Sequence, residues 1–419
     1  MKRHSHFFLS VSKHGQDNGM GMPEIEIEKH VKNYWGSIGR LLNDEEQAAF
    51  NEIEKQFIDP TEYNPVKAVD VAKWLDPTTL LDILKTRYPY FDMIKERLIP
   101  RFRFFVYMTI SKKRSVRQAY LSLSESDFLQ LGFGKKPTYE LLREFLYERI
   151  GVEEFSSVFH CIVKEIVFLL RKKDILLGTQ TFQDATDVRA LKHDPDAKYS
   201  GYYKESGYKL DVTIDAELEI PLHYLPTEIT VDEGKNLVPS QEQLVSLGIK
   251  EKERIVDDKY ATYGNIAQSE TQEIKMFYKI ADHWVSNPCG GPEEIKSLYQ
   301  KYHKECDFVA GADLDFMLQY LNRKGESEAV GAYFRNQRMT EAKKHPSEYE
   351  KKCKKRGSRM EGFFGRIKTT TILDDHPGRR GWRGFLLRAG FSMLSLVFVA
   401  LIRVQNGILD HLTNVTYII

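Results

Sequence analysis

The chain has 419 residues, enough for two or more domains that each bury a hydrophobic core. Hydrophobic residues make up 42% of it and charged residues 29%, a composition that excludes a fibrous or largely disordered protein. The 61 Lys and Arg residues nearly balance the 60 Asp and Glu residues, so the net charge of +1 gives no global indication of a polyanionic partner. Any case for nucleic-acid binding must come from local clusters of charge.

The cysteines and the apolar runs indicate a protein of the cytosol. The four cysteines are few and scattered, with no CxxC pair, which favours a reducing compartment. Residues 1–40 are expected to be a poorly ordered tail, because their apolar run is too short for a signal peptide. The run from Ala389 to Ile402 has 14 residues between Arg388 and Arg403, fewer than the ~20 of a membrane span. We therefore expect a buried core helix there, and no membrane partner.

Residues 41–175 are predicted to form a helical region. Their apolar residues recur at three-to-four spacing, as in YELLREFLYERI, and Lys136-Pro137-Thr138 precedes that stretch in the manner of a helix start. Short helices joined by turns can present a recognition helix to DNA, although most helical bundles do not. This region is therefore a candidate DNA-binding domain.

Residues 176–286 have the sequence pattern of a mixed α/β core. TQTFQDATDV, YKLDVTID and LEIPLHYLPTEI read as strands, and they are followed by a helix (QEQLVSL), a strand (ERIVDD), a helix and a strand (IKMFYKI). Three strands that can meander antiparallel, then helix, strand, helix and strand, is the order of a ribonuclease-H-like sheet. Residues 287–345 are expected to be a helical insertion, and 346–419 to complete the core with its last helices. The predicted fold is α+β, with a helical N-terminal region.

Three acids stand at positions where carboxylates need an explanation. Asp184 lies in the middle of the first strand, where a buried carboxylate costs several kcal/mol unless it is paired or bound to metal. Asp257 ends a strand, and two carboxylates brought together by adjacent strands repel each other without a cation. Glu361, beside the apolar face of a helix, would complete two divalent-metal sites about 3.5–4 Å apart. The simpler alternative is a turn-forming Asp and a solvent-facing helical Glu.

The motifs around these acids resemble those of the DDE transposases of bacterial and archaeal insertion sequences, over most of the chain. The first block is Asp184-Ala185-Thr186 on a strand, followed by Asp194-Pro195-Asp196-Ala197 and Gly207-Tyr208-Lys209. In the second, IVDDKYATYGNIA, Tyr260 stands three residues after Asp257. The third has Lys368 seven residues after Glu361, with a basic, apolar tail behind it. The helical front half, with LGFGKKPTYELLREFLYERI, is also similar to the N-terminal region of these enzymes.

The chain departs from the family pattern at two places. Many relatives carry an Arg four residues before the catalytic Glu, and here that position is Gly357, with Arg356 and Arg359 on either side. Where many relatives read Asp-Lys-Gly-Tyr, this chain reads Asp-Asp-Lys-Tyr from Asp257, so Asp258 is an alternative second ligand.

The resemblance implies metal-dependent DNA transposition. Two Mg²⁺ or Mn²⁺ ions held by Asp184, Asp257 and Glu361 would support nicking of the element end and attack of the freed 3′-hydroxyl on target DNA, without a protein nucleophile. The implied partners are element ends, target DNA and a second copy of the chain, in the cytoplasm of a prokaryote, at the nucleoid. Two alternatives stay open: a catalytically inactive, transposase-derived DNA-binding protein, and a stand-alone metal-dependent nuclease.

The approach to Glu361 is rich in basic residues. Between Tyr349 and Met360 the only acid is Glu350, which leaves little local charge to cancel them. Although a basic run is more often a solvated face, phosphate contact is the functional interpretation here. The candidate DNA-binding residues are Arg356, Arg359, Arg366 and Lys368.

A possible zinc site falls in the insertion. His283 and Cys289 form one pair and His303 and Cys306 another, with thirteen residues between the pairs. This is not a standard zinc spacing, and the alternative is a set of scattered, partly buried residues.

Overall fold

The computed structural model describes residues 68–190, 193–202, 204–280, 327–374, 380–409 and 412–413. All of them belong to one compact unit, which begins at Val66. The expected tail at 1–40, the quartet of His283, Cys289, His303 and Cys306, and most of the expected insertion lie outside the described residues.

The first part of the described chain is helical. Its elements are α4 (Ala68–Trp74), η1 (Leu81–Arg87), α5 (Phe91–Ile110), α6 (Val116–Leu121), α7 (Glu125–Gln130), α8 (Tyr139–Glu144), η2 (Phe145–Ile150), η3 (Val152–Glu154) and α9 (Phe155–Arg171). Short polar side chains begin several of them: the hydroxyl oxygens of Ser115, Ser124 and Thr138 each accept a hydrogen bond from a backbone N–H of the first turn.

A six-stranded sheet follows. Its strands are β1 (Gln180–Arg189), β2 (Lys198–Ser200), β3 (Glu205–Asp215), β4 (Pro221–Glu228), β5 (Glu253–Val256) and β6 (Lys275–Tyr278). The order is β4-β3-β1-β5-β6, with the short β2 beside the start of β3. β3 is antiparallel to β1 and β4, whereas β5 is parallel to β1 and β6 is parallel to β5. This is the ribonuclease-H-like arrangement, so the predicted fold class is confirmed.

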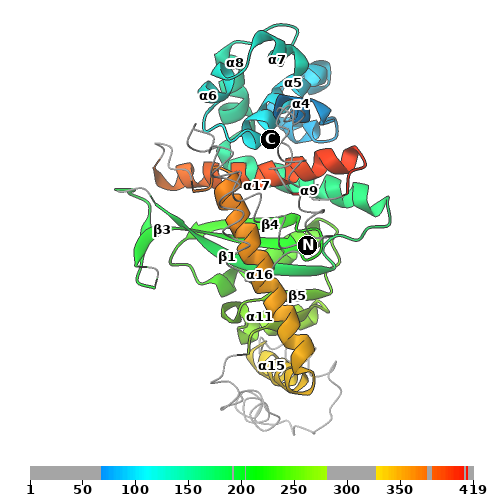
Figure 1. The fold of residues 1–419 in the computed structure, drawn as a ribbon, viewed down its shortest axis with the longest axis vertical. Helices are drawn as coiled ribbons and strands as arrows, with labels where there is room; N and C mark the ends of the chain where they lie inside the picture. Colours follow the sequence, from blue (N-terminus) through cyan, green and yellow to red (C-terminus); the bar gives the residue numbers. More distant parts are fainter. Residues whose placement is uncertain are drawn as a thin grey trace, which may run out of the picture. The chain divides into compact units, whose positions relative to one another are not determined.

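Helices cover both faces of the sheet. The remaining elements are η4 (Glu233–Asn236), α10 (Leu237–Ser246), η5 (Asp258–Tyr260), α11 (Tyr263–Thr271), α15 (Ser327–Lys344), α16 (Pro346–Thr370) and α17 (Gly381–Gln405). In Figure 1, α16 runs across the sheet. Side chains alternate along a strand, so the even-numbered residues of β1 and β3 face α16 and α17, and the odd-numbered ones face α10. Arg356 of α16 thus meets Asp184, while Ser240 of α10 meets Thr213.

The long apolar helix α17 is the centre of the hydrophobic core. It packs against α5 and α9 on one side and β4 on another, and in Figure 1 it lies between the N-terminal helices and the sheet. The ring of Phe398 stands edge-on to Phe102 and Phe105. By length and composition α17 would suffice to cross a membrane, but 94% of its most apolar window is buried inside the protein. The expected core helix is confirmed.

The Asp-Pro-Asp-Ala stretch caps the N-terminus of α17. A carboxylate oxygen of Asp194 accepts from the N–H of Gly381 at 3.0 Å, and one of Asp196 accepts from the N–H of Trp382 at 2.8 Å. The hydroxyl of Tyr208 donates to Asp194 at 2.8 Å. A carboxylate at a helix N-terminus accepts hydrogen bonds from the free N–H groups and interacts favourably with the positive end of the helix dipole. The first block of the family resemblance therefore ties α17 to the connection between β1 and β2.

Candidate active site

Two of the three predicted acids stand together. Phe182 pairs with Ile255 at the end of the parallel β1–β5 ladder, and two residues further along the chain come Asp184, within β1, and Asp257, the first residue after β5. Both carboxylates contact Arg356 of α16: its Nη1 donates to Asp184 Oδ2 at 2.6 Å, and its Nη2 to Asp257 Oδ1 at 3.4 Å. One guanidinium therefore lies against two carboxylates.

Among the described residues, each of these two acids makes an ion pair with Arg356 alone. The pKa of Asp184 is raised to about 6, chiefly because the carboxyl group is buried; the charge of Arg356 and the N–H of Ala185 act to lower it, and the charge of Asp257 acts to raise it. The Nε of Arg356 is buried and has no hydrogen-bond partner among the described residues. The guanidinium is thus an incompletely satisfied counter-ion, and the two carboxylate oxygens are of the kind that hard divalent cations prefer.

Asp257 and Asp258 have different positions. Glu253 and Asp257 point to the α16 side of β5, where they meet Lys352 and Arg356, whereas Arg254 points to the α10 side. Asp258 is the first residue of η5 and makes no ion pair within the described residues. Strand alternation thus brings Asp257, and not Asp258, beside Asp184.

Glu361 is on the helix that crosses the two aspartates, but it does not touch them. It is exposed, beside the buried Met360, and makes no hydrogen bond or ion pair with the described residues. Two turns further on, Lys368 reaches the carbonyl of Asp187 in β1 at 2.9 Å. Glu361 shares one side of the helix with Lys368, but it stands about 140° around the helix from Arg356, which contacts the two aspartates. In the described part of the chain no three His, Cys, Asp or Glu side chains gather closely enough to hold a metal.

The basic residues of α16 are less available than the local sequence suggests. Arg359 and Arg366 both form ion pairs with Glu219, from the β3–β4 turn, and Lys355 pairs with Glu217 of the same turn. Burial would raise the pKa of Glu219, but the two arginines outweigh it and lower that pKa. The expectation that little nearby charge cancels this run was wrong, because the acids come from another part of the chain. Contact of these residues with DNA stays a prediction.

A buried polar network lies on the opposite face of the sheet. Asp211 of β3 is fully buried and accepts hydrogen bonds from Tyr260, Gln183 and Asn236. Burial raises its pKa to about 7 in spite of these donors. Gln183 precedes Asp184, and Tyr260 follows Asp257 by three residues. The network therefore joins the backbone segments on which both acids are carried.

A fully buried arginine completes this network. Arg254 of β5 forms two hydrogen bonds of 2.8 Å with the carboxylate of Glu251, and it also donates to Gln183 Oε1 at 2.8 Å and Ser240 Oγ at 3.1 Å. Its charge is both neutralised and hydrogen-bonded, as burial requires. This cluster was not predicted from the sequence. Its only local signal was the alternation of polar and apolar residues in YKLDVTID.

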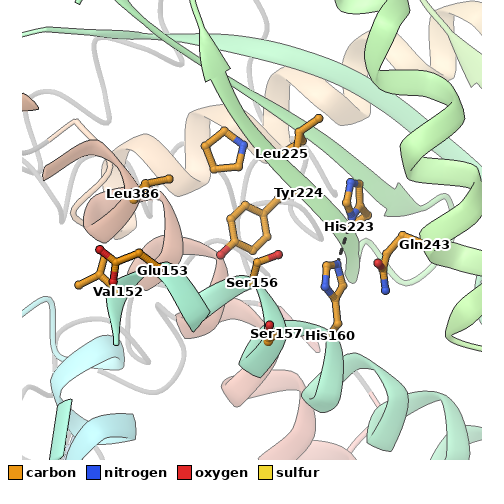
Figure 2. Close-up of a pocket in the computed structure, with 11 residues that line it drawn as sticks. Val152, Glu153, Ser156, Ser157, His160, His223, Tyr224, Leu225, Gln243 and Leu386 are labelled. Atoms are coloured by element: carbon orange, nitrogen blue, oxygen red, sulfur yellow. Dashed lines mark hydrogen bonds between the residues drawn. The ribbon is translucent and has the colours of Figure 1, made fainter. Parts of the chain in front are cut away.

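A histidine pair joins the helical region to the sheet. His160 Nε2 of α9 and His223 Nδ1 of β4 are 3.1 Å apart, with the rings nearly parallel (Figure 2). Burial lowers the pKa of His160 to about 4 and that of His223 to about 3, so both rings are neutral at pH 7. They line a pocket of about 360 Å³ together with Ser156, Tyr224 and Gln243. No sequence motif marked this pair.

The chain was compared with known proteins. No family model and no curated protein matches it. Among solved structures it is similar to a piggyBac transposase synaptic complex with hairpin DNA, at 11% identity and a TM-score of 0.34, over 85% of this chain and 81% of that one. A second similar structure, the Mos1 mariner paired end complex with Mn, has 14% identity and a TM-score of 0.18, over 44% of this chain and 60% of that one. Scores this low identify no family.

Proposed function

We propose that this protein is a DDE transposase of the insertion-sequence type, which cuts element ends and joins them to target DNA with divalent metal ions. The observation that carries the proposal is the placement of Asp184, in β1, and Asp257, at the end of the adjacent parallel strand β5, where the two share one cationic partner. Two carboxylates on neighbouring strands of a ribonuclease-H-like sheet form the open half of a two-metal site. The motif resemblance stated above supports the same function.

The residues present fit a divalent metal. Asp184 and Asp257 would hold it with the oxygens that now contact Arg356, and Glu361 would supply the third carboxylate after a rearrangement of α16. Bound Mg²⁺ or Mn²⁺, two ions in the proposed site, would activate water or a 3′-hydroxyl and offset charge on the phosphorus. Arg356 would then release the carboxylates and be available to a DNA phosphate, which it can bind through two N–H groups.

The test is a cleavage and strand-transfer assay with a plasmid that carries the DNA flanking the coding sequence on both sides, in Mg²⁺ or Mn²⁺. Asp184→Asn, Asp257→Asn and Glu361→Gln should each lower cleavage about a hundredfold or more, the scale of losing one transition-state contact. Asp258→Asn is the matched control and should cleave as the parent does. Full activity in the Asp184 or Glu361 variant contradicts the mechanism.

The same assay separates the alternative functions. Joining of a labelled 3′-end to plasmid DNA supports a transposase, whereas cutting without joining supports a stand-alone nuclease. Binding without cutting supports an inactive DNA-binding protein. A transposase must also bring two ends together, so we propose a homodimer on DNA, and a prokaryotic cytoplasm as its location.

DNA contact by the basic face of α16 has its own test. Glu219→Gln removes the charge that holds Arg359 and Arg366. If these arginines contact phosphate, the variant should bind duplex DNA several-fold more tightly at low salt and lose that gain at high salt, because phosphate contacts release counter-ions. Glu217→Gln, which frees only Lys355, is the control and should give a smaller gain. Unchanged affinity in Glu219→Gln argues against the contact.

A further inference from the structure

A second pocket lies between the α8–η2 segment and the first turn of α17. It has a volume of about 460 Å³. We call it the arginine–tyrosine pocket, since its lining is Tyr139, Arg143, Tyr147, Arg380, Arg383 and Gly384. Three guanidinium groups and two phenol rings thus converge on one opening, and no acidic residue is in the lining. The proposed catalytic site uses none of these residues.

The positive charge of this pocket is only partly balanced. Arg143 pairs with Glu148 at 2.7 Å and Arg383 with Glu153 at 3.1 Å, and all four side chains are about half exposed. Exposed pairs of this kind contribute little and are screened by salt, so a phosphate can displace the carboxylates. Arg380 is exposed and has no ion-pair partner within the described ranges. A surplus of cationic hydrogen-bond donors therefore faces the opening.

The aromatic residues extend beyond the pocket. Tyr139 is half-buried and stands edge-on to Tyr120, with 6.1 Å between the ring centroids. The ammonium group of Lys136 lies over the ring of Tyr120, 4.7 Å from its centroid. Two adjacent tyrosines thus lie between Lys136 and Arg143. Guanidinium groups bind phosphates through paired N–H donors, while aromatic rings pack on sugars and bases, so this set of side chains is suited to a nucleic-acid strand.

The wall of the pocket is held in place. The N–H groups of Gly381 and Trp382 are fixed by Asp194 and Asp196, and the ring of Trp382 packs near that of Tyr208 in β3. Arg380 and Arg383 therefore project from a helix end that is tied to the sheet carrying Asp184. Because this backbone is already ordered, a ligand that binds the two arginines causes little further loss of backbone conformational entropy.

We propose that the arginine–tyrosine pocket takes up one backbone phosphate of bound DNA, with the neighbouring sugar and base against its tyrosines. The identity of the strand as DNA rests on the proposed function, whereas the anionic, strand-like character of the ligand comes from the pocket itself. The contact is independent of sequence, because phosphates carry no base information. It anchors DNA at the junction of the helical region and the sheet, apart from the α16 face.

The experiment compares Arg380→Ala and Arg383→Ala with Arg87→Ala in the full-length protein. Arg87 is a matched control, since it pairs with Glu154 at 2.9 Å, is similarly exposed and lies outside the pocket lining. Affinity for a fluorescent DNA duplex is measured by anisotropy at several salt concentrations. Each pocket variant should bind several-fold more weakly and lower the slope of log affinity against log salt by about one, the value for one lost phosphate contact. Arg87→Ala should match the parent.

Phosphate ethylation interference locates the contact. Ethylation of one or two phosphates should block the parent protein and no longer matter to Arg380→Ala. Unchanged salt slopes and an unchanged interference pattern in both pocket variants would overturn the proposal. So would equal competition by a single-stranded RNA of the same length, which would make the ligand another nucleic acid. Melting temperatures equal to that of the parent establish that the variants are folded.

The outcome is separable from that of the proposed function. If Asp184→Asn abolishes cleavage while the pocket variants keep the parental salt slope, the pocket proposal alone fails. If the pocket variants lose the slope while Asp184→Asn and Glu361→Gln still cleave, the pocket stands and the proposed mechanism fails.

Discussion

Asp184 of β1 and Asp257, the first residue after the parallel strand β5, share the guanidinium of Arg356. That group is therefore the protein's own counter-ion for two carboxylates. A divalent cation would carry out the same electrostatic task with twice the charge, so in the proposed site a metal would compete with the guanidinium for the same oxygens.

Replacing the guanidinium should make metal binding visible in stability. Arg356→Ala leaves the two carboxylates without a counter-ion, and we expect the metal-free free energy of unfolding to fall by roughly 1–3 kcal/mol, less than the ~3–5 kcal/mol of a fully buried pair because this one is partly exposed. Added Mn²⁺ should then raise the melting temperature more in the variant than in the parent, since metal stabilises the state it binds. Scanning fluorimetry with a MnCl₂ titration measures both.

Lys352→Ala is the control for this experiment. Lys352 lies one turn earlier on α16 and pairs with Glu253 at 2.8 Å, so its loss removes a charge near the sheet without freeing Asp184 or Asp257. Its Mn²⁺ response should equal that of the parent. An equal Mn²⁺ response in Arg356→Ala as well would mean that the guanidinium does not occupy a metal position.

The buried Asp211 should make stability depend on pH. Its folded pKa is about 7, above the ~3.9 of an unfolded Asp, so the folded state holds the proton more tightly. The protonated Asp211 therefore makes its full contribution to the free energy of unfolding below about pH 4, and this contribution is lost as the pH rises to 7. The difference in unfolding free energy between the parent and Asp211→Asn should fall by roughly 2–3 kcal/mol from pH 5 to pH 8. Urea unfolding at a series of pH values measures it, and a constant difference would contradict the prediction.

The histidine pair should act in the opposite direction. The pKa values of His160 and His223 are lowered to about 4 and 3, so between these values and the ~6.5 of an unfolded His it is the unfolded state that binds protons more tightly. The stability that depends on neutral rings is present above pH 6.5 and is lost toward pH 4. The parent should therefore lose stability relative to His223→Gln by roughly 2–3 kcal/mol from pH 7 to pH 4.5. The same urea series tests this, and equal pH slopes for the two proteins would refute it.

Close packing of α17 predicts a glycine that cannot be replaced. A Cβ on Gly390 would stand 2.6 Å from the ring of Phe155, in a tightly packed core. Overpacking in Gly390→Ala should lower the free energy of unfolding by roughly 1–3 kcal/mol, more than the ~1 kcal/mol that the better helix propensity of Ala adds. Gly365→Ala on α16 is the control, because nothing lies within 4 Å of its Cβ position, and it should be neutral or stabilising. Chemical denaturation of both variants measures whether each substitution raises or lowers the free energy of unfolding.

Local patterns were sufficient to predict the order of the longer strands and of the helices between them, but not the short strand β2. The periods of apolar residues identified β1, β3 and β4 and the helices after them, because each pattern depends on near neighbours in the chain. The buried helix α17 was predictable for the same reason. The placement of Asp257 beside Asp184 also follows from strand alternation, once the parallel register is known.

Long-range pairing was not predictable in the same way. The alternation of Lys209, Asp211 and Thr213 with apolar residues is typical of a solvent-facing strand side, yet these residues are buried. Their partners, such as Glu233 and Asn236, come from distant segments. Likewise, Glu219, which pairs with Arg359 and Arg366 of α16, lies about 140 residues earlier in the chain. The spacing of residues along the chain does not show which distant residues come into contact in the fold.

The position of α17 also bears on how the protein is made. This helix follows, in the chain, every element against which it packs, and α16, which carries Arg356 and Glu361, comes just before it. During synthesis, α5, α9 and β4 emerge from the ribosome before their common packing partner exists, and their apolar surfaces stay uncovered until it arrives. The core beneath the proposed catalytic site is therefore completed only when α17 has been made. A product shortened before α17 would keep these apolar surfaces exposed to chaperones and proteases.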